Sequence, residues 1–383
     1  MTILLIAVAL GAFFMSIVLT LVVISFSKRH GLVDSPGSSG HTKNLRSVPN
    51  TGGVAIFLTI TIPVILALLV AFLGEGVVTS LAGEDAAQYT HGLRGLAPGL
   101  LALVIGTAIV HVMGLIDDRK AVPAWPKLLV MVAVSAALVL ISGERLFSFL
   151  DTNVGGPWLS QLLTILWIVI VMNAINFMDN MDGVAAGVTT IVASAIFATV
   201  LIGGEQWKVG ILLALLIGAC AGFLVFNFPR ASIFMGDSGS LVIGLVLGYI
   251  TIRATYFGAT VQTPWYSVFL PLVLLAVPLY DFLSVVIIRI AQGKSPMVGD
   301  QQHFGHRLRA HGLSDKQVWV VMCGATAVTG VSGIVLWGTD SWIAALVPVQ
   351  VALVLTLIAV YEHSSSVRVT SRADASPTTD QQE

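Results

Sequence analysis

Four polar residues recur at intervals of three in residues 173–183, which read NAINFMDNMDG between two long apolar stretches: Asn173, Asn176, Asp179 and Asp182. Within a helical turn, residues three apart share a face. A carboxylate in the middle of a bilayer costs about 2.5 to 3.5 kcal/mol on a mild insertion scale, so such groups line wet cavities or bind a partner. We therefore interpret this run as a binding site; the alternative is a polar loop between two spans.

Asp117 and Asp118 form an acidic pair at the end of another apolar stretch, directly before Arg119 and Lys120. Adjacent carboxylates can hold Mg²⁺, because this hard cation usually takes one or two carboxylates together with substrate phosphates. The basic neighbours would suit an anionic substrate. The alternative is an ordinary polar end of a membrane helix.

The sequence GDSGS at residues 236–240 precedes a further apolar stretch. Asp and Ser are common residues at the start of a helix, and capping alone would explain them. The amino end of a helix also carries partial positive charge and free N–H donors, which bind phosphate oxygens. Asp237 could satisfy the cap and still present an oxygen to a metal, so both interpretations stay open.

The loop at residues 293–312 combines basic groups with two histidines three residues apart. Arginine offers a planar fork to phosphate, and neutral histidine can donate or accept a hydrogen bond. This combination favours a nucleotide-sugar diphosphate over a structural zinc site, because no cysteine accompanies the histidines. A solvated basic loop beneath an anionic leaflet is the alternative. The residues concerned are Lys294, Asp300, His303, His306, Arg307 and Arg309.

Membrane helices are predicted to position these groups. Of the 383 residues, 56% are hydrophobic and only 10% charged, and the mean hydropathy is +0.93, whereas soluble proteins have about 25% charged residues. This composition indicates an all-α integral membrane protein with a single helical bundle. The net charge of -1 provides no overall field that would attract nucleic acid.

Loop charge predicts how the bundle is oriented. With eleven spans, fifteen Lys and Arg residues lie on one side of the membrane and four on the other. Short cytoplasmic loops carry the excess of Lys and Arg, so the side with fifteen is predicted to be cytoplasmic. The prediction is an outside amino terminus, a cytoplasmic carboxyl terminus and all four polar regions on the cytoplasmic side. Residues 1–361 are predicted to form one transmembrane transferase domain and residues 362–383 a disordered cytoplasmic tail. The predicted spans are residues 3–26, 53–73, 95–115, 127–142, 157–175, 184–203, 209–227, 240–257, 266–289, 317–337 and 341–361.

Taken together, these motifs resemble those of the polyprenyl-phosphate N-acetylhexosamine-1-phosphate transferases. The Asp-Asp-Arg and His-x-x-His-Arg sequences look more like the GlcNAc-1-phosphate branch than the muramoyl-pentapeptide branch. The resemblance covers about residues 1–315 and rests on GLVDSP (31–36), VPNTGG (48–53), GLIDDR (114–119), NAINFMDNMDG, FNFPRASIFMGDSGSL (226–241) and the loop at 303–307, in this order.

The resemblance implies a reaction: transfer of an N-acetylhexosamine 1-phosphate, with GlcNAc preferred, from a UDP-sugar to polyprenyl (undecaprenyl) phosphate, with release of UMP. Mg²⁺ or Mn²⁺ would be the cofactor, and the lipid bilayer of the cell membrane would surround the multi-pass protein, with its active site in the cytoplasm. The product would initiate a lipid-linked cell-envelope glycan. A homodimer is left open.

The resemblance also implies roles for individual residues. Asp237 and Asn176 would bind the metal, and Asp117 with Asp118 would orient or deprotonate the lipid phosphate, so that the three aspartates are the expected catalytic residues. The expected substrate-binding residues are Asn173, Lys127 at a phosphate, Asp179 and Asp182 around the nucleotide, and His303, His306 and Arg307 at the sugar end.

Three positions depart from the family pattern. Asn44 stands where the first loop usually has a histidine, Gly305 replaces the middle histidine of His-x-His-His-Arg, and Asn180 replaces a glycine between the two acids. The carboxylates remain, so activity is expected, but the sugar stays open, as do the polyprenol length and the pathway. The alternatives are a phospho-N-acetylmuramoyl-pentapeptide transferase, a membrane transporter with cytoplasmic acidic ion sites, and an inactive scaffold.

Overall fold

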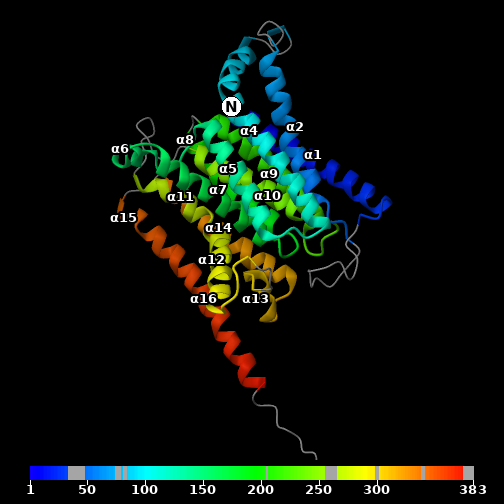
Figure 1. Ribbon diagram of the computed structural model, residues 1–383, viewed down its shortest axis with the longest axis vertical. Helices are drawn as coiled ribbons and strands as arrows, with labels where there is room; N and C mark the ends of the chain where they lie inside the picture. Colours follow the sequence, from blue (N-terminus) through cyan, green and yellow to red (C-terminus); the bar gives the residue numbers. More distant parts are fainter. Residues whose placement is uncertain are drawn as a thin grey trace, which may run out of the picture.

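A computed structural model describes residues 1–32, 48–73, 79–80, 84–203, 206–254, 265–297, 302–337 and 341–373. Within these ranges the chain forms helices and connecting loops without a β-sheet, so the all-α prediction is confirmed. Figure 1 shows the helices gathered into one bundle. Asn44, Asp300 and the end of the GLVDSP motif lie outside the described residues.

Each predicted span corresponds to a helix or to a pair of helices. The long helices are α1 (Thr2–Arg29), α2 (Gly52–Phe72), α4 (Glu84–Arg119), α5 (Ala124–Ser142), α7 (Trp158–Met178), α8 (Val184–Gly203), α9 (Trp207–Asn227), α10 (Asp237–Arg253), α12 (Ala276–Ala291), α14 (Asp315–Trp337) and α16 (Leu346–Ala373). The short elements are η1 (Ser148–Leu150), α6 (Asp151–Val154), η2 (Trp265–Phe269), α11 (Leu270–Leu274), α13 (Phe304–Ala310) and α15 (Ser341–Ala344).

In the described part of the chain, nine helices are long and apolar enough to cross a membrane. A tenth span is formed if the segments Tyr266–Leu274 and Ala276–Ala291, which are bent by 69° at their junction, count as one. The protein is thus a multi-pass membrane protein, while the predicted number of eleven spans and the predicted orientation stay predictions. α16 continues to Ala373, and the division into a domain ending at residue 361 and a disordered tail also stays a prediction.

α10 lies inside the bundle, where it contacts α2, α4, α7 and α9 (Figure 1). Residues 238–252 are all buried, as expected for a helix whose residues are apolar or small on every side. Its 17 residues extend over about 26 Å, close to the thickness of a hydrocarbon core. The polar start of α10 at Asp237 is therefore surrounded by the ends of other helices.

Glycines allow those helices to approach the first turn of α10. A Cβ atom at Gly53 of α2 would overlap the backbone nitrogen of Gly239, and one at Gly114 of α4 would overlap backbone atoms of Ser238. Any other residue at these two positions would force the helices apart. Because Gly114 is followed by Asp117 and Asp118, this close approach places the acidic end of α4 beside Asp237.

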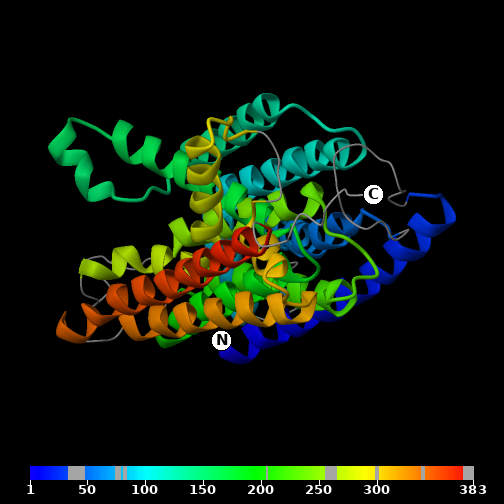
Figure 2. The same cartoon turned by 90° about the horizontal axis from the view of Figure 1, so that it is seen from below.

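Helices from the beginning and the end of the chain pack on the outside of these central helices. α1 packs along α9, where a Cβ at Gly218 would lie 2.5 Å from the Cβ of Ala12; such small residues let membrane helices approach closely. α14 packs against α8 and against α16, which lies beside it at the edge of the bundle (Figure 2).

Candidate active site

Asp237, the first residue of α10, meets Asn176 from the last turn of α7. Asn176 Nδ2 donates hydrogen bonds to Asp237 Oδ1 and to Ser240 Oγ, each at 2.9 Å. Ser240 Oγ in turn donates to the backbone oxygen of Gly236 at 3.1 Å. The two residues that the resemblance implies as metal ligands are thus in direct contact, although they are 61 positions apart in the sequence.

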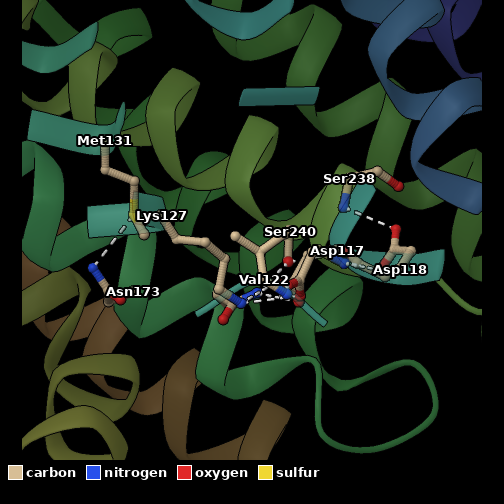
Figure 3. A network of polar contacts seen from close by, with 11 residues as sticks. Asp117, Asp118, Val122, Lys127, Met131, Asn173, Ser238 and Ser240 are labelled. Atoms are coloured by element: carbon tan, nitrogen blue, oxygen red, sulfur yellow. Dashed lines mark hydrogen bonds and ion pairs between the residues drawn. The ribbon is translucent and has the colours of Figure 1, made fainter. Parts of the chain in front are cut away.

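Lys127 joins this centre to the acidic end of α4. Its Nζ lies 2.9 Å from Asp117 Oδ2 and 3.0 Å from Asp237 Oδ2, so one ammonium group bridges two carboxylates. Asp117 Oδ1 accepts a further hydrogen bond, from the backbone N–H of Val122 at 2.7 Å (Figure 3). The side chains of Asp117, Lys127 and Asp237 are 14%, 21% and 25% exposed, so a ligand can still reach this centre.

Asp118 points to the backbone at the start of α10. Its Oδ1 accepts the N–H of Asp237 at 2.8 Å and its Oδ2 that of Ser238 at 3.2 Å, so a side chain of α4 caps another helix (Figure 3). Gly236, directly before, has φ +71°, and a Cβ there would lie 2.5 Å from Asp118 Oδ2. Asp118 therefore holds Asp237 in place, which sequence reasoning did not foresee.

Asp179 and Asp182 also bind backbone amides. α7 ends at Met178, so both lie in the following turn, where Asp179 Oδ2 accepts the N–H of Gly236 at 3.1 Å and Asp182 Oδ2 that of Ala231 at 2.9 Å. Both carboxylates fasten the loop at residues 228–236 to the end of α7. They shape the edge of the site next to Asp237.

Asn227 was missed by sequence reasoning, and it acts on the same loop. It is buried at the end of α9, where its Oδ1 accepts the N–H of Gly183 at 3.0 Å and its Nδ2 donates to the oxygen of Ile233 at 2.8 Å. Asn227 thus joins the turn after α7 to the loop before α10. The sequence placed Asn227 within the motif at residues 226–241 but gave it no role.

Asn173 contributes least to the centre. Its Nδ2 donates to the backbone oxygen of Val169 at 2.8 Å, within its own helix, and lies 3.6 Å from the sulfur of Met131 (Figure 3). It lies one turn before Asn176 on α7, and neither of these two contacts reaches an aspartate. Among the residues expected to bind substrate, Asn173 is the one directed towards its own helix.

The histidine segment, residues 303–307, forms a second polar group, which Asp281 of α12 holds in place. Asp281 is completely buried. Its Oδ1 accepts the N–H of Phe304, the first residue of α13, at 2.6 Å, and its Oδ2 lies 3.5 Å from His303 Nδ1. The rings of His303 and of Phe177 in α7 pack perpendicular to each other, with their centroids 4.8 Å apart, which connects this group to the polar run. A charged residue within an apolar span was the signal that could have found Asp281.

Arg307 and His306 lie on α13, one turn beyond. Arg307 Nε is 3.1 Å from Glu362 Oε1 of α16, and Arg307 also donates to Ser284 Oγ of α12 at 2.9 Å. The rings of His303 and His306 are 6.4 Å apart. Glu362 was not singled out in the sequence, because it stands beyond the last predicted span, where nothing marked it as a partner of the loop.

The donor atoms of the centre fit a hard divalent cation. Asp117, Asp237 and the Asn176 amide supply oxygen ligands, the kind that Mg²⁺ and Mn²⁺ take. Within the described ranges, no group of three or more His, Cys, Asp and Glu residues is arranged to hold a metal. An ion held by Asp237 and Asn176 would therefore complete its coordination with water and substrate phosphates, as Mg²⁺ usually does.

Comparison with known proteins shows which proteins this chain is similar to. Residues 100–255 match the family described as Glycosyl transferase family 4. The chain is 30% identical to a Bacillus subtilis protein named probable undecaprenyl-phosphate N-acetylglucosaminyl 1-phosphate transferase, over 91% of this chain and 90% of that protein. It is 33% identical to a decaprenyl-phosphate N-acetylglucosaminephosphotransferase of Mycolicibacterium smegmatis, over 82% and 79%. A phospho-N-acetylmuramoyl-pentapeptide-transferase of Desulforudis audaxviator is 33% identical over 61% and 71%.

Proposed function

Since the chain belongs to glycosyl transferase family 4, we propose that it transfers N-acetylglucosamine 1-phosphate from UDP-N-acetylglucosamine to undecaprenyl or another polyprenyl phosphate and releases UMP. The observation that carries the proposal is the cluster of Asp117, Lys127, Asn176 and Asp237, which four helices bring together at one end of the bundle. The names of the similar proteins support the sugar phosphate and the lipid acceptor.

In the proposed reaction, an oxygen of the lipid phosphate attacks the phosphorus that carries the sugar. The bond from this phosphorus to the bridging oxygen breaks, and UMP leaves with that oxygen. Mg²⁺ or Mn²⁺, held by Asp237 and Asn176, would supply positive charge at the pyrophosphate. Positioning and charge neutralisation dominate such transfers.

The remaining residues of the centre then have supporting roles. Lys127 neutralises phosphate charge, and Asp117, which is bound to the ammonium and to the Val122 amide, orients the lipid phosphate. Asp118 keeps the start of α10 in place. Because a phosphate is already largely ionised at neutral pH, the acceptor needs little help from a base.

A panel of donors tests the function. Purified protein in detergent, with undecaprenyl phosphate and Mg²⁺, is expected to release UMP fastest from UDP-N-acetylglucosamine, and only when the lipid phosphate is present. EDTA should stop the reaction. In sealed inside-out vesicles the donor should react without detergent, since we propose that the site faces the cytoplasm of the cell membrane.

Other outcomes of the panel identify the alternatives. UMP release from UDP-N-acetylmuramoyl-pentapeptide alone would show the chemistry of the muramoyl-pentapeptide transferases, one of which matches part of the chain. Solute accumulation in proteoliposomes without UMP would indicate a transporter. An absence of UMP from every donor would refute the proposal.

The Lys127→Met substitution should lower the rate of transfer about 100-fold, a typical loss when one group that stabilises transferred charge is removed. Without the ammonium, Asp117 and Asp237 repel each other and a phosphate loses its cation. Lys127→Arg, which keeps the charge but changes its geometry, should recover part of the rate. Lys208→Met is the matched control, since Lys208 lies over the ring of Trp207 at the start of α9. If the Lys127→Met variant is as active as the parent, the ion pairs of Lys127 with Asp117 and Asp237 have a structural role only.

The Asp281→Ala substitution should lower the rate about 10- to 100-fold, by analogy with the loss that follows removal of a carboxylate that orients a metal-ligating histidine. The N–H of Phe304 would lose its acceptor and His303 its neighbour. UMP release and donor KM measure the effect. Leu283→Ala, at a half-exposed position of the same helix, serves as the control, and an unchanged KM and rate in Asp281→Ala would contradict a role for Asp281 at the donor site.

A further inference from the structure

Two of the positions that depart from the motif pattern touch each other in the fold. Asn180 lies in the turn after α7, and Gly305 is the second residue of α13. A Cβ atom at Gly305 would lie 2.7 Å from Met181 Sδ and 3.0 Å from Asn180 Oδ1. Helix α13 is therefore seated on this turn so closely that a side chain at position 305 would have to displace both the Met181 thioether and the Asn180 amide.

Asn180 cannot easily give way to such a side chain. Its Nδ2 donates to the backbone oxygen of Phe177 at 2.6 Å, which ties the side chain back to α7. Its Oδ1 is buried and, among the described residues, has no hydrogen-bond partner. Rotating the amide would break the bond to Phe177, so Asn180 acts as a fixed spacer between the turn and Gly305.

This contact stands between the two polar groups of the site. On one side, Asp179 binds the N–H of Gly236, which precedes Asp237. On the other, Gly305 follows His303, whose ring packs on Phe177 at 4.8 Å. The contact of α13 with Asn180 thus lies between the Asp237 centre and the histidine segment, which Asp281 also holds.

We propose that Asn180 and Gly305 are a coupled pair of positioning residues that determines how the sugar end of the donor fits. Asn180, together with Met181, fills the space that a side chain at 305 would take, and its contact with Gly305 helps to fix where His303, His306 and Arg307 stand. A side chain at position 305 alone displaces α13, whereas with glycine at position 180 the flexible Met181 side chain can move into the vacated space and α13 keeps its seat. The part of this proposal that concerns the donor rests on the proposed function.

A double-mutant cycle tests the pair, with Gly305→His, Asn180→Gly and the double variant. Gly305→His alone should raise the donor KM about tenfold or more, with a smaller change in kcat, and lower the melting temperature. Asn180→Gly should raise KM by a few-fold. The double variant should return to within about threefold of the parental KM and regain the melting temperature, so that the single effects do not multiply.

Gly324→His is the matched control for the glycine exchange, because a Cβ at Gly324 of α14 meets no atom within 4 Å. Multiplicative single effects, or a tolerated Gly305→His, would overturn the proposal. Recovery of the melting temperature without recovery of KM would reduce the pair to packing and also overturn the positioning role. The comparison of melting temperatures among the four proteins needs no substrate. If the parent is inactive with every donor, the proposed function is refuted, and the melting temperatures still test the contact between Asn180 and Gly305.

Discussion

Asp237→Ala is expected to lower the rate of transfer about 1,000-fold, at the upper end of losses for a single group that stabilises transferred charge. Asp237 is bound on one oxygen by Asn176 and on the other by Lys127, so its removal breaks both links of the centre at once. It also takes away the carboxylate proposed to hold the metal. UMP release at saturating UDP-N-acetylglucosamine measures the loss.

The Asp237→Asn substitution removes the negative charge of this side chain and keeps its shape. The amide retains an oxygen that can accept a hydrogen bond from Asn176, but it neither neutralises Lys127 nor binds a divalent cation as a carboxylate does. We expect nearly the same loss of rate, with a melting temperature closer to that of the parent. Asp151→Asn is the control: Asp151 pairs with Arg145 at 2.6 Å, beyond the other end of α5 from Lys127. Parental activity in both Asp237 variants would show that the chemistry takes place elsewhere.

Asp118→Ala is expected to lower both the rate of transfer and the stability of the protein. The N–H groups of Asp237 and Ser238 would lose their acceptor, and each unsatisfied buried donor costs about 1 to 3 kcal/mol. The start of α10 would then shift, and Asp237 with it, so that the rate should fall about 100-fold. The melting temperature and UMP release are measured on the same preparation.

The Asp118→Asn substitution distinguishes a role in capping α10 from a direct role of Asp118 in the reaction. One amide oxygen can still accept the N–H of Asp237, so a residue that acts as a cap should keep the rate within about tenfold of the parent, since one neutral hydrogen bond contributes about 0.5 to 1.5 kcal/mol. An Asn variant that is as inactive as Asp237→Asn, with an unchanged melting temperature, would instead give the carboxylate of Asp118 a direct part in the reaction.

The sequence alone determined the membrane class, the all-helical bundle and the family. These follow from local properties: apolar stretches of about 20 residues must be helical in lipid, since every backbone polar group has to be satisfied within the segment. The polar runs were visible for the same reason, because ionisable groups are rare in such surroundings. Asn176 and Asp237, which the resemblance implies as metal ligands, are in contact, and their binding of a metal stays a prediction.

Only the tertiary structure decided which aspartates point into the centre and which bind the backbone. Asp117 and Asp118 are neighbours in the sequence, yet one pairs with Lys127 and the other caps α10. That difference depends on how closely α4 approaches α10 at Gly114, a packing contact that no local pattern records.

The same physical reason explains the residues that sequence reasoning missed. Asp281 acts on an amide 23 positions away and Asn227 on one 44 positions away, and nothing in the sequence beside either residue indicates its partner. The contact of Asn180 with Gly305 likewise exists only because α13 folds back on the turn after α7. Sequence spacing identifies groups that share a helix face, whereas the partner across a helix interface is fixed by the packing of the whole bundle.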